Sequence, residues 1–126
     1  MFSKTKAYSG FAVDDLARAR TFYGETLGVD TEVVDEDNGF MTLHLAGERD
    51  TFVYVKPDFV AATYTILNFV VDDVERVVDD LGARGVTFEH YEGFDQDAKG
   101  IARGQGPDIA WFKDPAGNIL AVMTDG

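Results

Sequence analysis

The chain has 126 residues and no cysteine, and 45% of its residues are hydrophobic and 27% charged. This length and composition predict one folded domain with its own core, and they exclude disulfides and thiolate chemistry. The formal net charge of −12 repels nucleic acid and anionic lipid, so we expect neither as a partner. No apolar run is long enough for a membrane span or a signal peptide, so we expect a cytoplasmic protein.

The first half of the chain predicts one strand, one helix and three more strands. Alternation predicts a strand over Lys6–Val13, and Asp14 and Asp15 follow where a helix N-cap needs a short acceptor. Apolar residues then recur at helical spacing as far as a capping glycine, Gly28. Further strands are predicted at Asp30–Asp35, Phe40–Ala46 and Thr51–Lys56.

The second half repeats this order. A strand is predicted over Tyr64–Val71, a cap at Asp72 or Asp73, and a helix that ends at Gly85. Strands are then predicted at Val86–Tyr91, Asp108–Lys113 and Ile119–Met123. A polar loop fills residues 92–107, and we expect its middle, Ala98–Arg103, to pair as an edge strand.

The repetition is visible in the sequence itself. Phe11–Arg18 reads FAVDDLAR and Phe69–Arg76 reads FVVDDVER. The chain is therefore predicted to be two copies of strand–helix–strand–strand–strand, over about residues 5–58 and 63–124. Each copy is too small to bury its own sheet, so we expect both to share the core of one domain, residues 1–126.

Two phrases carry a resemblance to a known family. VDDLARARTFYGETLGV (Val13–Val29) and WFKDPAGNILAV (Trp111–Val122) resemble the opening and closing phrases of the vicinal oxygen chelate superfamily, which includes glyoxalases, bleomycin resistance proteins and dioxygenases. The resemblance implies an α+β fold of tandem βαβββ modules. These form a U-shaped, mostly antiparallel sheet around a cavity, with the helices outside. It also implies a homodimer.

In the family's enzymes, four inward side chains hold a divalent metal. Carried over one by one, these positions fall at Tyr8, Val53, Ile66 and Ala121. Metal ions of this kind need imidazole or carboxylate donors, which these residues lack. We therefore expect no metal and no other cofactor.

Strand alternation predicts which other residues line the cavity. With Tyr8 inward, Gly10 and Ala12 also point inward, while Phe11 and Val13 pack under the helix. In the second copy, Ile66, Asn68 and Val70 point inward in the same way. Asn68 either orients a ligand or is satisfied by a neighbouring strand or water.

Aromatic residues are the remaining candidates for ligand contact. Trp111, the only tryptophan, is either a stacking wall for a planar ligand or a residue of the core or of a dimer contact. Tyr8 is either a ligand contact or a core plug whose hydroxyl reaches solvent. Phe40, Tyr54 and Phe112 contribute by the same logic if their faces point inward.

Catalytic candidates are few. The two histidines, His44 and His90, lie in predicted strands, and His90 borders the polar loop, which makes it the better candidate for a general base. Tyr8 is the other candidate, and an acidic loop residue such as Asp97 is a third possible proton carrier.

The sequence favours a metal-independent protein that binds a small aromatic or cationic molecule. The acidic balance fits a cationic ligand, although solubility alone also accounts for it. One alternative is a metal-independent lyase or isomerase. Another is a metal-dependent glyoxalase or dioxygenase, which the lost ligand positions disfavour. A further alternative is a degenerate relative that acts only in dimerisation or regulation.

Overall fold

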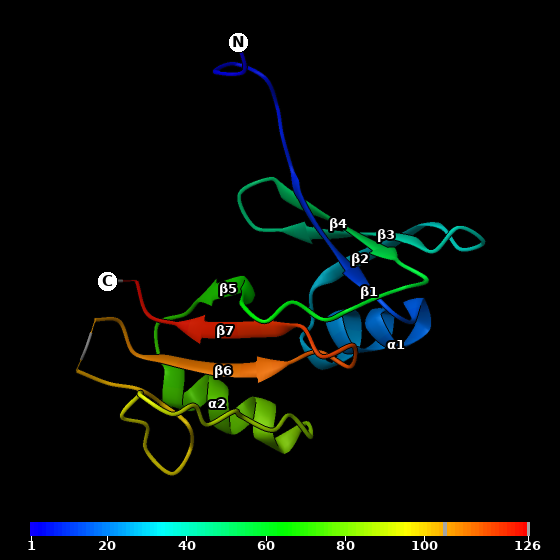
Figure 1. Ribbon diagram of the computed structural model, residues 1–126. Coiled ribbons are helices and arrows are strands. Elements are labelled where there is room, and N and C mark those ends of the chain that lie inside the picture. Colours follow the sequence, from blue (N-terminus) through cyan, green and yellow to red (C-terminus); the bar gives the residue numbers. More distant parts are fainter. Residues whose placement is uncertain (105, 126) are drawn as a thin grey trace. The chain divides into compact units, whose positions relative to one another are not determined.

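The computed structural model describes residues 1–104 and 106–125. The chain divides into two compact units, Met1–Val60 and Ala61–Gly126, called here the N-terminal unit and the C-terminal unit. Each contains helical segments and one mixed sheet (Figure 1), so the α+β class is confirmed. In the described residues, no helix is both long and apolar enough to cross a bilayer.

The N-terminal unit contains a four-stranded sheet in the order β1-β4-β3-β2. Its strands are β1 (Ser9–Val13), β2 (Asp30–Asp35), β3 (Phe40–Leu45) and β4 (Arg49–Val55). The first strand pairs with the last in parallel, and the other neighbours are antiparallel. The predicted strands are therefore present, with ends shifted by up to three residues.

The helix of this unit begins at the predicted cap but changes its winding. The Asp15 side chain accepts a hydrogen bond from the Arg18 amide, 3.0 Å away, and α1 (Leu16–Arg20) follows. The chain continues as a π-helix, η1 (Thr21–Thr26), in which the Leu27 amide donates to the Phe22 carbonyl. Gly28 then takes a φ of +71°, as expected of a capping glycine.

The core of the N-terminal unit lies between this helix and one face of the sheet. Tyr23 is fully buried, and its ring centroid lies 5.6 Å from that of Phe11 on β1. Phe11 is paired with Val53, which is paired with Met41, so these three share the helix-covered face. Val53 and Met41 have no exposed surface.

The C-terminal unit contains a three-stranded sheet, β5-β7-β6, covered on one face by α2 (Figure 1). The strands are β5 (Thr65–Val70), β6 (Ile109–Lys113) and β7 (Ile119–Met123), and α2 is Val74–Ala83. Asp73 caps α2 by accepting a hydrogen bond from the Arg76 amide, 3.2 Å away. The first strand again pairs in parallel with the last.

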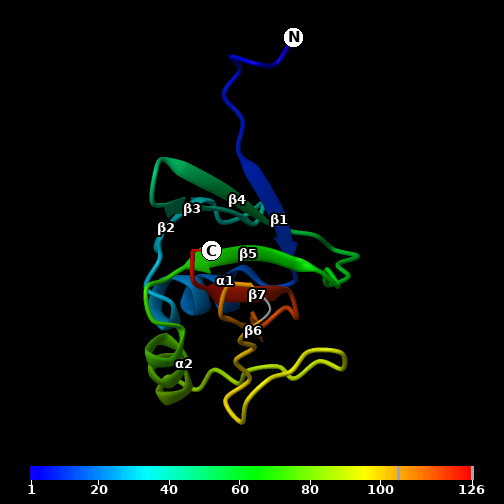
Figure 2. The same ribbon diagram turned by 90° about the vertical axis from the view of Figure 1, so that its left-hand side faces the viewer.

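One predicted strand of the C-terminal unit is absent. Instead of a strand over Val86–Tyr91, a single bridge joins Phe88 to Phe112. The predicted edge strand at Ala98–Arg103 is likewise reduced to bridges made by Ala102. The described residues between α2 and β6 form a long loop, yellow in Figure 2, whose polar groups bond within the loop rather than along a strand ladder.

Candidate functional site

The face of each sheet opposite its own helix, called here the helix-free face, is the place where inward-pointing residues were expected. In the N-terminal unit, Gly10 is paired with Phe52 and Ala12 with Tyr54. Phe11 and Val13 lie on the opposite face beneath the helix, as alternation predicted. Gly10 and Ala12 therefore occupy the helix-free face.

The expected orientation of Val53 is wrong. Val53 is paired with Phe11 on the helix-covered face and is fully buried there. The residues of β4 on the helix-free face are its neighbours, Phe52 and Tyr54. A shift of one residue in the alignment of this strand reverses the direction of every side chain, which explains the error.

Three aromatic side chains, called here the aromatic row, lie side by side on the helix-free face of the N-terminal unit. The ring centroids of Phe40 and Phe52 are 5.3 Å apart, and those of Phe52 and Tyr54 are 5.8 Å apart. All three residues are half-buried. A Cβ atom at Gly10 would lie only 3.1 Å from the Phe52 carbonyl oxygen, so the neighbouring strand approaches closely and presents no side chain.

Sequence reasoning named Phe40 and Tyr54 conditionally and missed Phe52. Alternation within β4 places residues 52 and 54 together, but only the pairing of β4 with β1 shows which face they share. Phe112, the other conditional candidate, is fully buried beneath α2, with its ring 5.5 Å from that of Phe88. It cannot contact a ligand on the helix-free face.

An imidazole flanked by carboxylates lies on the same face as the aromatic row. His44 on β3 is paired with Asp30 on β2 and Asp50 on β4. His44 Nδ1 lies 2.9 Å from Asp50 Oδ1, and its Nε2 lies 3.9 Å from Glu32 Oε1. The hydrogen bond to Asp50 raises the pKa of His44 above its ordinary value, and the negative charges of Asp30 and Glu32 act in the same direction.

This arrangement reverses the expected ranking of the two histidines. His90 is exposed and has no hydrogen bond or ion pair within residues 1–104 and 106–125. A histidine that acts as a general base needs a partner to orient its ring. His44 has such a partner and His90 has none.

The helix-free face of the C-terminal unit carries three of the expected residues in one row. Asn68 is paired with Ala121, which is paired with Trp111. The opposite face carries Leu120 and Phe112, which are fully buried. The amide of Asn68 is exposed, as is Val70 farther along the same strand. Ile66 is half-buried at a register shift between Thr65 and Leu67.

Trp111 is covered by two aromatic side chains from the loop. Its ring centroid lies 5.6 Å from that of Tyr91 and 4.9 Å from that of Phe94. Trp111 is only 9% exposed, whereas Phe94 is 51% exposed. The Tyr91 hydroxyl is buried without a hydrogen-bond partner in the described residues, and this burial, with the charge of Glu89, raises the pKa of Tyr91.

Tyr8 lies outside the sheet. It immediately precedes β1, which begins at Ser9, and it is 66% exposed. The reading of Tyr8 as a core plug is therefore wrong. Its proposed roles in ligand contact or proton transfer stay predictions.

The side chains at the four carried-over positions do not fit a metal ion. Tyr8, Ile66 and Ala121 offer one phenol and two hydrocarbons, and neither Val53 nor its neighbours Phe52 and Tyr54 supply a carboxylate or imidazole. In the described part of the chain, no group of three or more histidine, aspartate or glutamate side chains is placed to hold one.

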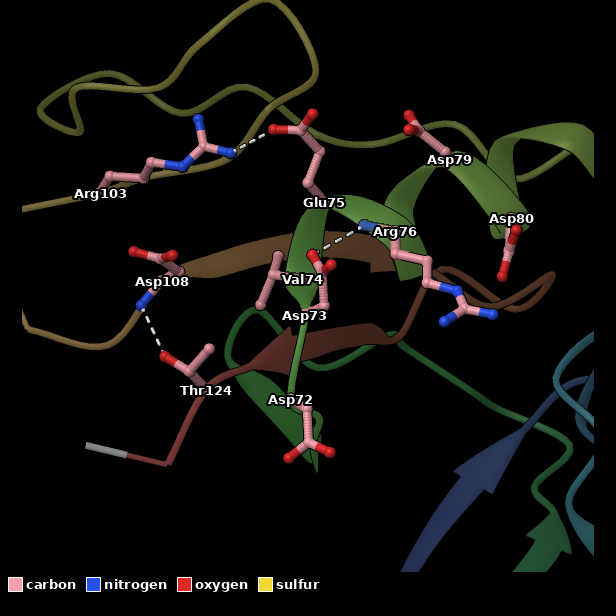
Figure 3. A pocket seen from close by; sticks show the side chains of 10 residues that line it. All are labelled: Asp72, Asp73, Val74, Glu75, Arg76, Asp79, Asp80, Arg103, Asp108 and Thr124. Atoms are coloured by element: carbon pink, nitrogen blue, oxygen red, sulfur yellow. Dashed lines mark hydrogen bonds and ion pairs between the residues drawn. The ribbon is translucent and has the colours of Figure 1, made fainter.

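A recess of about 780 Å³ lies at the beginning of α2 in the C-terminal unit (Figure 3). Its lining is mainly acidic and consists of Asp72, Asp73, Val74, Glu75, Arg76, Asp79, Asp80, Arg103, Asp108 and Thr124. Many of its polar groups already bond within the unit. Asp73 caps the helix, the Asp108 amide donates to the Thr124 hydroxyl, and Arg103 contacts Glu75.

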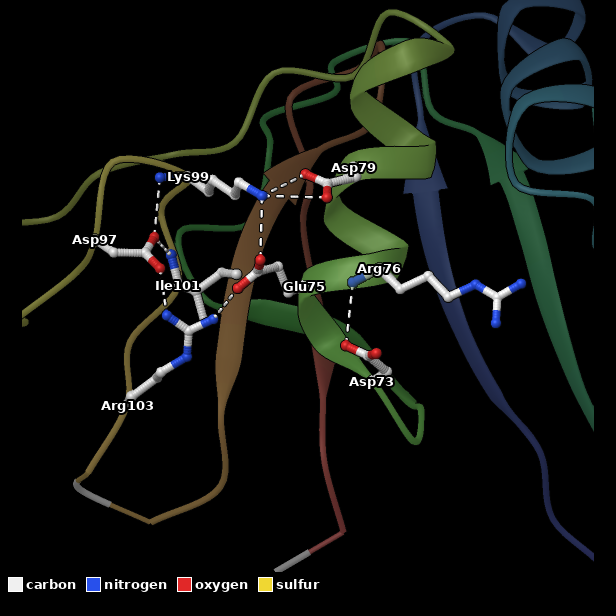
Figure 4. A network of polar contacts seen from close by, with 8 residues as sticks. All are labelled: Asp73, Glu75, Arg76, Asp79, Asp97, Lys99, Ile101 and Arg103. Atoms are coloured by element: carbon white, nitrogen blue, oxygen red, sulfur yellow. Dashed lines mark hydrogen bonds and ion pairs between the residues drawn. The ribbon is translucent and has the colours of Figure 1, made fainter.

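The same helix is joined to the loop by a network of charged groups (Figure 4). Lys99 Nζ lies 3.3 Å from Glu75 and 2.9 Å from Asp79, and Arg103 bridges Glu75 and Asp97. Partial burial tends to raise the pKa of Asp97, but hydrogen bonds from the Ile101 and Lys99 amides and the charge of Arg103 lower it overall. Asp97 thus organises the loop, which disfavours its role as a proton carrier.

A match to a model of a protein family shows the family of the chain. The model of the Glyoxalase/Bleomycin resistance protein/Dioxygenase superfamily matches residues 7–122. The chain therefore belongs to this superfamily, as its two phrases predicted. No curated protein matches the chain.

Solved structures share the fold at low sequence identity. A putative glyoxalase family protein from Bacillus anthracis is 20% identical, with a TM-score of 0.72 and full coverage of both chains. An antibiotic-binding protein from a Streptomyces species is 22% identical, with a TM-score of 0.71 and 98% of each chain covered. A lactoylglutathione lyase from Agrobacterium tumefaciens is 19% identical, with a TM-score of 0.69 and coverage of 97% of this chain and 95% of that one.

Proposed function

We propose that this protein binds a small aromatic molecule without the help of a metal ion. The aromatic row on the helix-free face of the N-terminal unit carries the proposal. Its rings lie beside Gly10 and Ala12, whose small size leaves Phe52 and Tyr54 free of a covering side chain from β1. Ring faces of this kind stack on planar ligands.

The chemistry of the lost ligand positions supports the metal-independent form of this proposal. A metal-dependent glyoxalase or dioxygenase requires carboxylate or imidazole donors on the strands, and the corresponding residues here lack them. The same fold is used by an antibiotic-binding protein, so binding without a reaction is compatible with this architecture.

Calorimetric titration with planar aromatic compounds tests the proposal. We expect acridine and its N-methylated cation to bind with Kd values in the micromolar range, which corresponds to a binding free energy on the order of −8 kcal/mol. Treatment with a strong chelator before the titration should leave these values unchanged. Saturating ligand should also raise the melting temperature, because it binds the folded state only.

Replacing one ring of the aromatic row locates the site. Phe52→Ala removes the central ring, and we expect it to weaken binding about fivefold, the effect of losing one aromatic pair. Phe2→Ala removes an aromatic side chain that is 75% exposed outside the sheet and serves as the matched control. Equal affinity in the three proteins, or no heat with either compound, would contradict the proposal.

A further inference from the structure

Charged groups continue the aromatic row along the helix-free face of the N-terminal unit. Pairing across the strands places Glu32, Thr42 and Phe52 in one row and Asp30, His44 and Asp50 in the next. Asp50 is therefore the next residue of β4 on the same face as Phe52, and Glu32 lies across β3 from that ring, beyond Thr42. Glu32 and Asp50 have side chains that are 63% and 46% exposed, so their charges are accessible to a ligand.

Apart from His44, every charged residue in these two rows is acidic. The structure describes every residue of these two rows, and none of them is a lysine or an arginine. A cation placed over an aromatic ring is attracted by the ring itself, and a nearby carboxylate adds a second attraction. A planar aromatic cation would satisfy both groups at once, while a neutral compound of the same shape would use only the rings.

We propose that the helix-free face of the N-terminal unit selects planar aromatic cations, and that protonation of His44 controls their affinity. The inference rests on the proposed function, because it assumes that the aromatic row binds ligands. It adds the charge of the ligand and the means by which its affinity is regulated.

The position of His44 gives this control its direction. The imidazole faces Asp30 and Glu32 from β2 and Asp50 from β4. When His44 is protonated, its positive charge compensates one carboxylate and repels a bound cation. When it loses the proton, the cluster becomes more negative by one charge and attracts the cation more strongly. Affinity for a cation should therefore rise with pH.

A pair of probes that differ only in charge tests the proposal. N-methylacridinium is a permanent cation, and acridine is its uncharged counterpart at neutral and alkaline pH. For the full chain titrated between about pH 7 and about pH 9, we expect N-methylacridinium to bind about fivefold more tightly at the upper end. Acridine should bind with the same Kd at both ends, because it carries no charge there.

Three variants separate the contributions of the charges. His44→Gln should abolish the pH dependence for N-methylacridinium. Glu32→Gln should weaken the binding of N-methylacridinium about threefold and leave the Kd of acridine unchanged. Glu25→Gln removes the same charge from η1, on the opposite side of the sheet, and should change neither Kd.

The outcomes distinguish this inference from the proposed function. If both probes bind equally well at every pH, the selection of cations is refuted while aromatic binding stands. If the pH dependence persists in His44→Gln, control by His44 is refuted. If neither probe binds, both the inference and the proposed function are wrong.

Discussion

The two units begin with the same phrase and end differently. In each, a strand leads to an aspartate that caps a helix, and the first strand pairs in parallel with the last. The N-terminal unit then forms three further strands, whereas the C-terminal unit replaces one of them with the loop between α2 and β6. The repeated phrase therefore specifies the strand, the cap and the helix start, and the segments that follow specify the rest.

Burial also distinguishes two similar turns. In the N-terminal unit, Asp35 accepts hydrogen bonds from Asn38 in an exposed turn. In the C-terminal unit, Asp114 and Asn118 make the same kind of contact but are only 4% and 2% exposed. A buried polar group that loses its partner costs more than an exposed one, because water cannot replace the bond.

Removing the buried aspartate should have the largest effect. Asp114→Ala takes away the acceptor for the Ala116 and Asn118 amides and for the Asn118 side chain. We expect a loss of about 3 kcal/mol in the free energy of unfolding, measured by urea denaturation. Asp35→Ala, the matched change in the exposed turn, should cost clearly less. Equal losses would show that burial does not distinguish the two turns.

Releasing the loop of the C-terminal unit should have the next largest effect. The Gln96 side chain accepts from the Tyr91 amide and donates to the Glu89 and Gly100 carbonyls, at 2.7, 2.9 and 2.7 Å. Gln96→Ala removes all three bonds, and we expect a loss of about 2 kcal/mol.

Hydrogen exchange across residues 86–104 measures where this loss acts. Faster exchange should be confined to the loop, because the loop loses the hydrogen bonds of Gln96 while the hydrogen bonds between the strands of the sheet are unchanged. The neighbouring Asp95→Ala, which removes an exposed side chain from the same loop, serves as the control. Unchanged exchange in Gln96→Ala would show that other contacts hold the loop.

The two helix caps should contribute about equally. Asp15→Ala and Asp73→Ala each remove the acceptor for an amide in the first helical turn, and we expect each to cost about 1 kcal/mol. The adjacent Asp14 and Asp72 do not provide the cap, so their alanine variants should have little effect on unfolding free energy. A larger loss of unfolding free energy in the Asp14 and Asp72 variants would show that Asp15 and Asp73 are not the caps.

Titration of His44 should give the smallest effect on stability. The hydrogen bond to Asp50 raises the pKa of His44 above its ordinary value in the folded protein, so the stabilisation is complete below the unfolded pKa. It is lost as the pH rises through the folded pKa. The melting temperature of the wild type should therefore decline over this range more than that of His44→Gln. The control variant His90→Gln should keep the decline, and its absence in that variant would contradict the assignment to His44.

Much of the fold could be predicted from local patterns. The strands Asp30–Asp35 and Ile119–Met123 have the predicted bounds, and both helices start after the predicted aspartates. These features depend on alternation, helical spacing and caps, which neighbouring residues determine. The superfamily was also predicted correctly, because the two phrases that indicated it are local sequence patterns.

The candidate site depended on contacts between distant segments. Val53 and Phe52 exchange faces if the strand shifts by one residue, and only the pairing of β4 with β1 determines the choice. His44 gains its carboxylates from two neighbouring strands. The bonds of Gln96 likewise hold a loop where the local pattern predicted a strand.

The sequence alone thus determined the repeat, the caps and the absence of metal-binding side chains at four positions, because these depend on residue type and local spacing. The tertiary structure decided which rings and charges share a sheet face, because that follows from strand register. Register is a relation between segments that lie far apart in the chain.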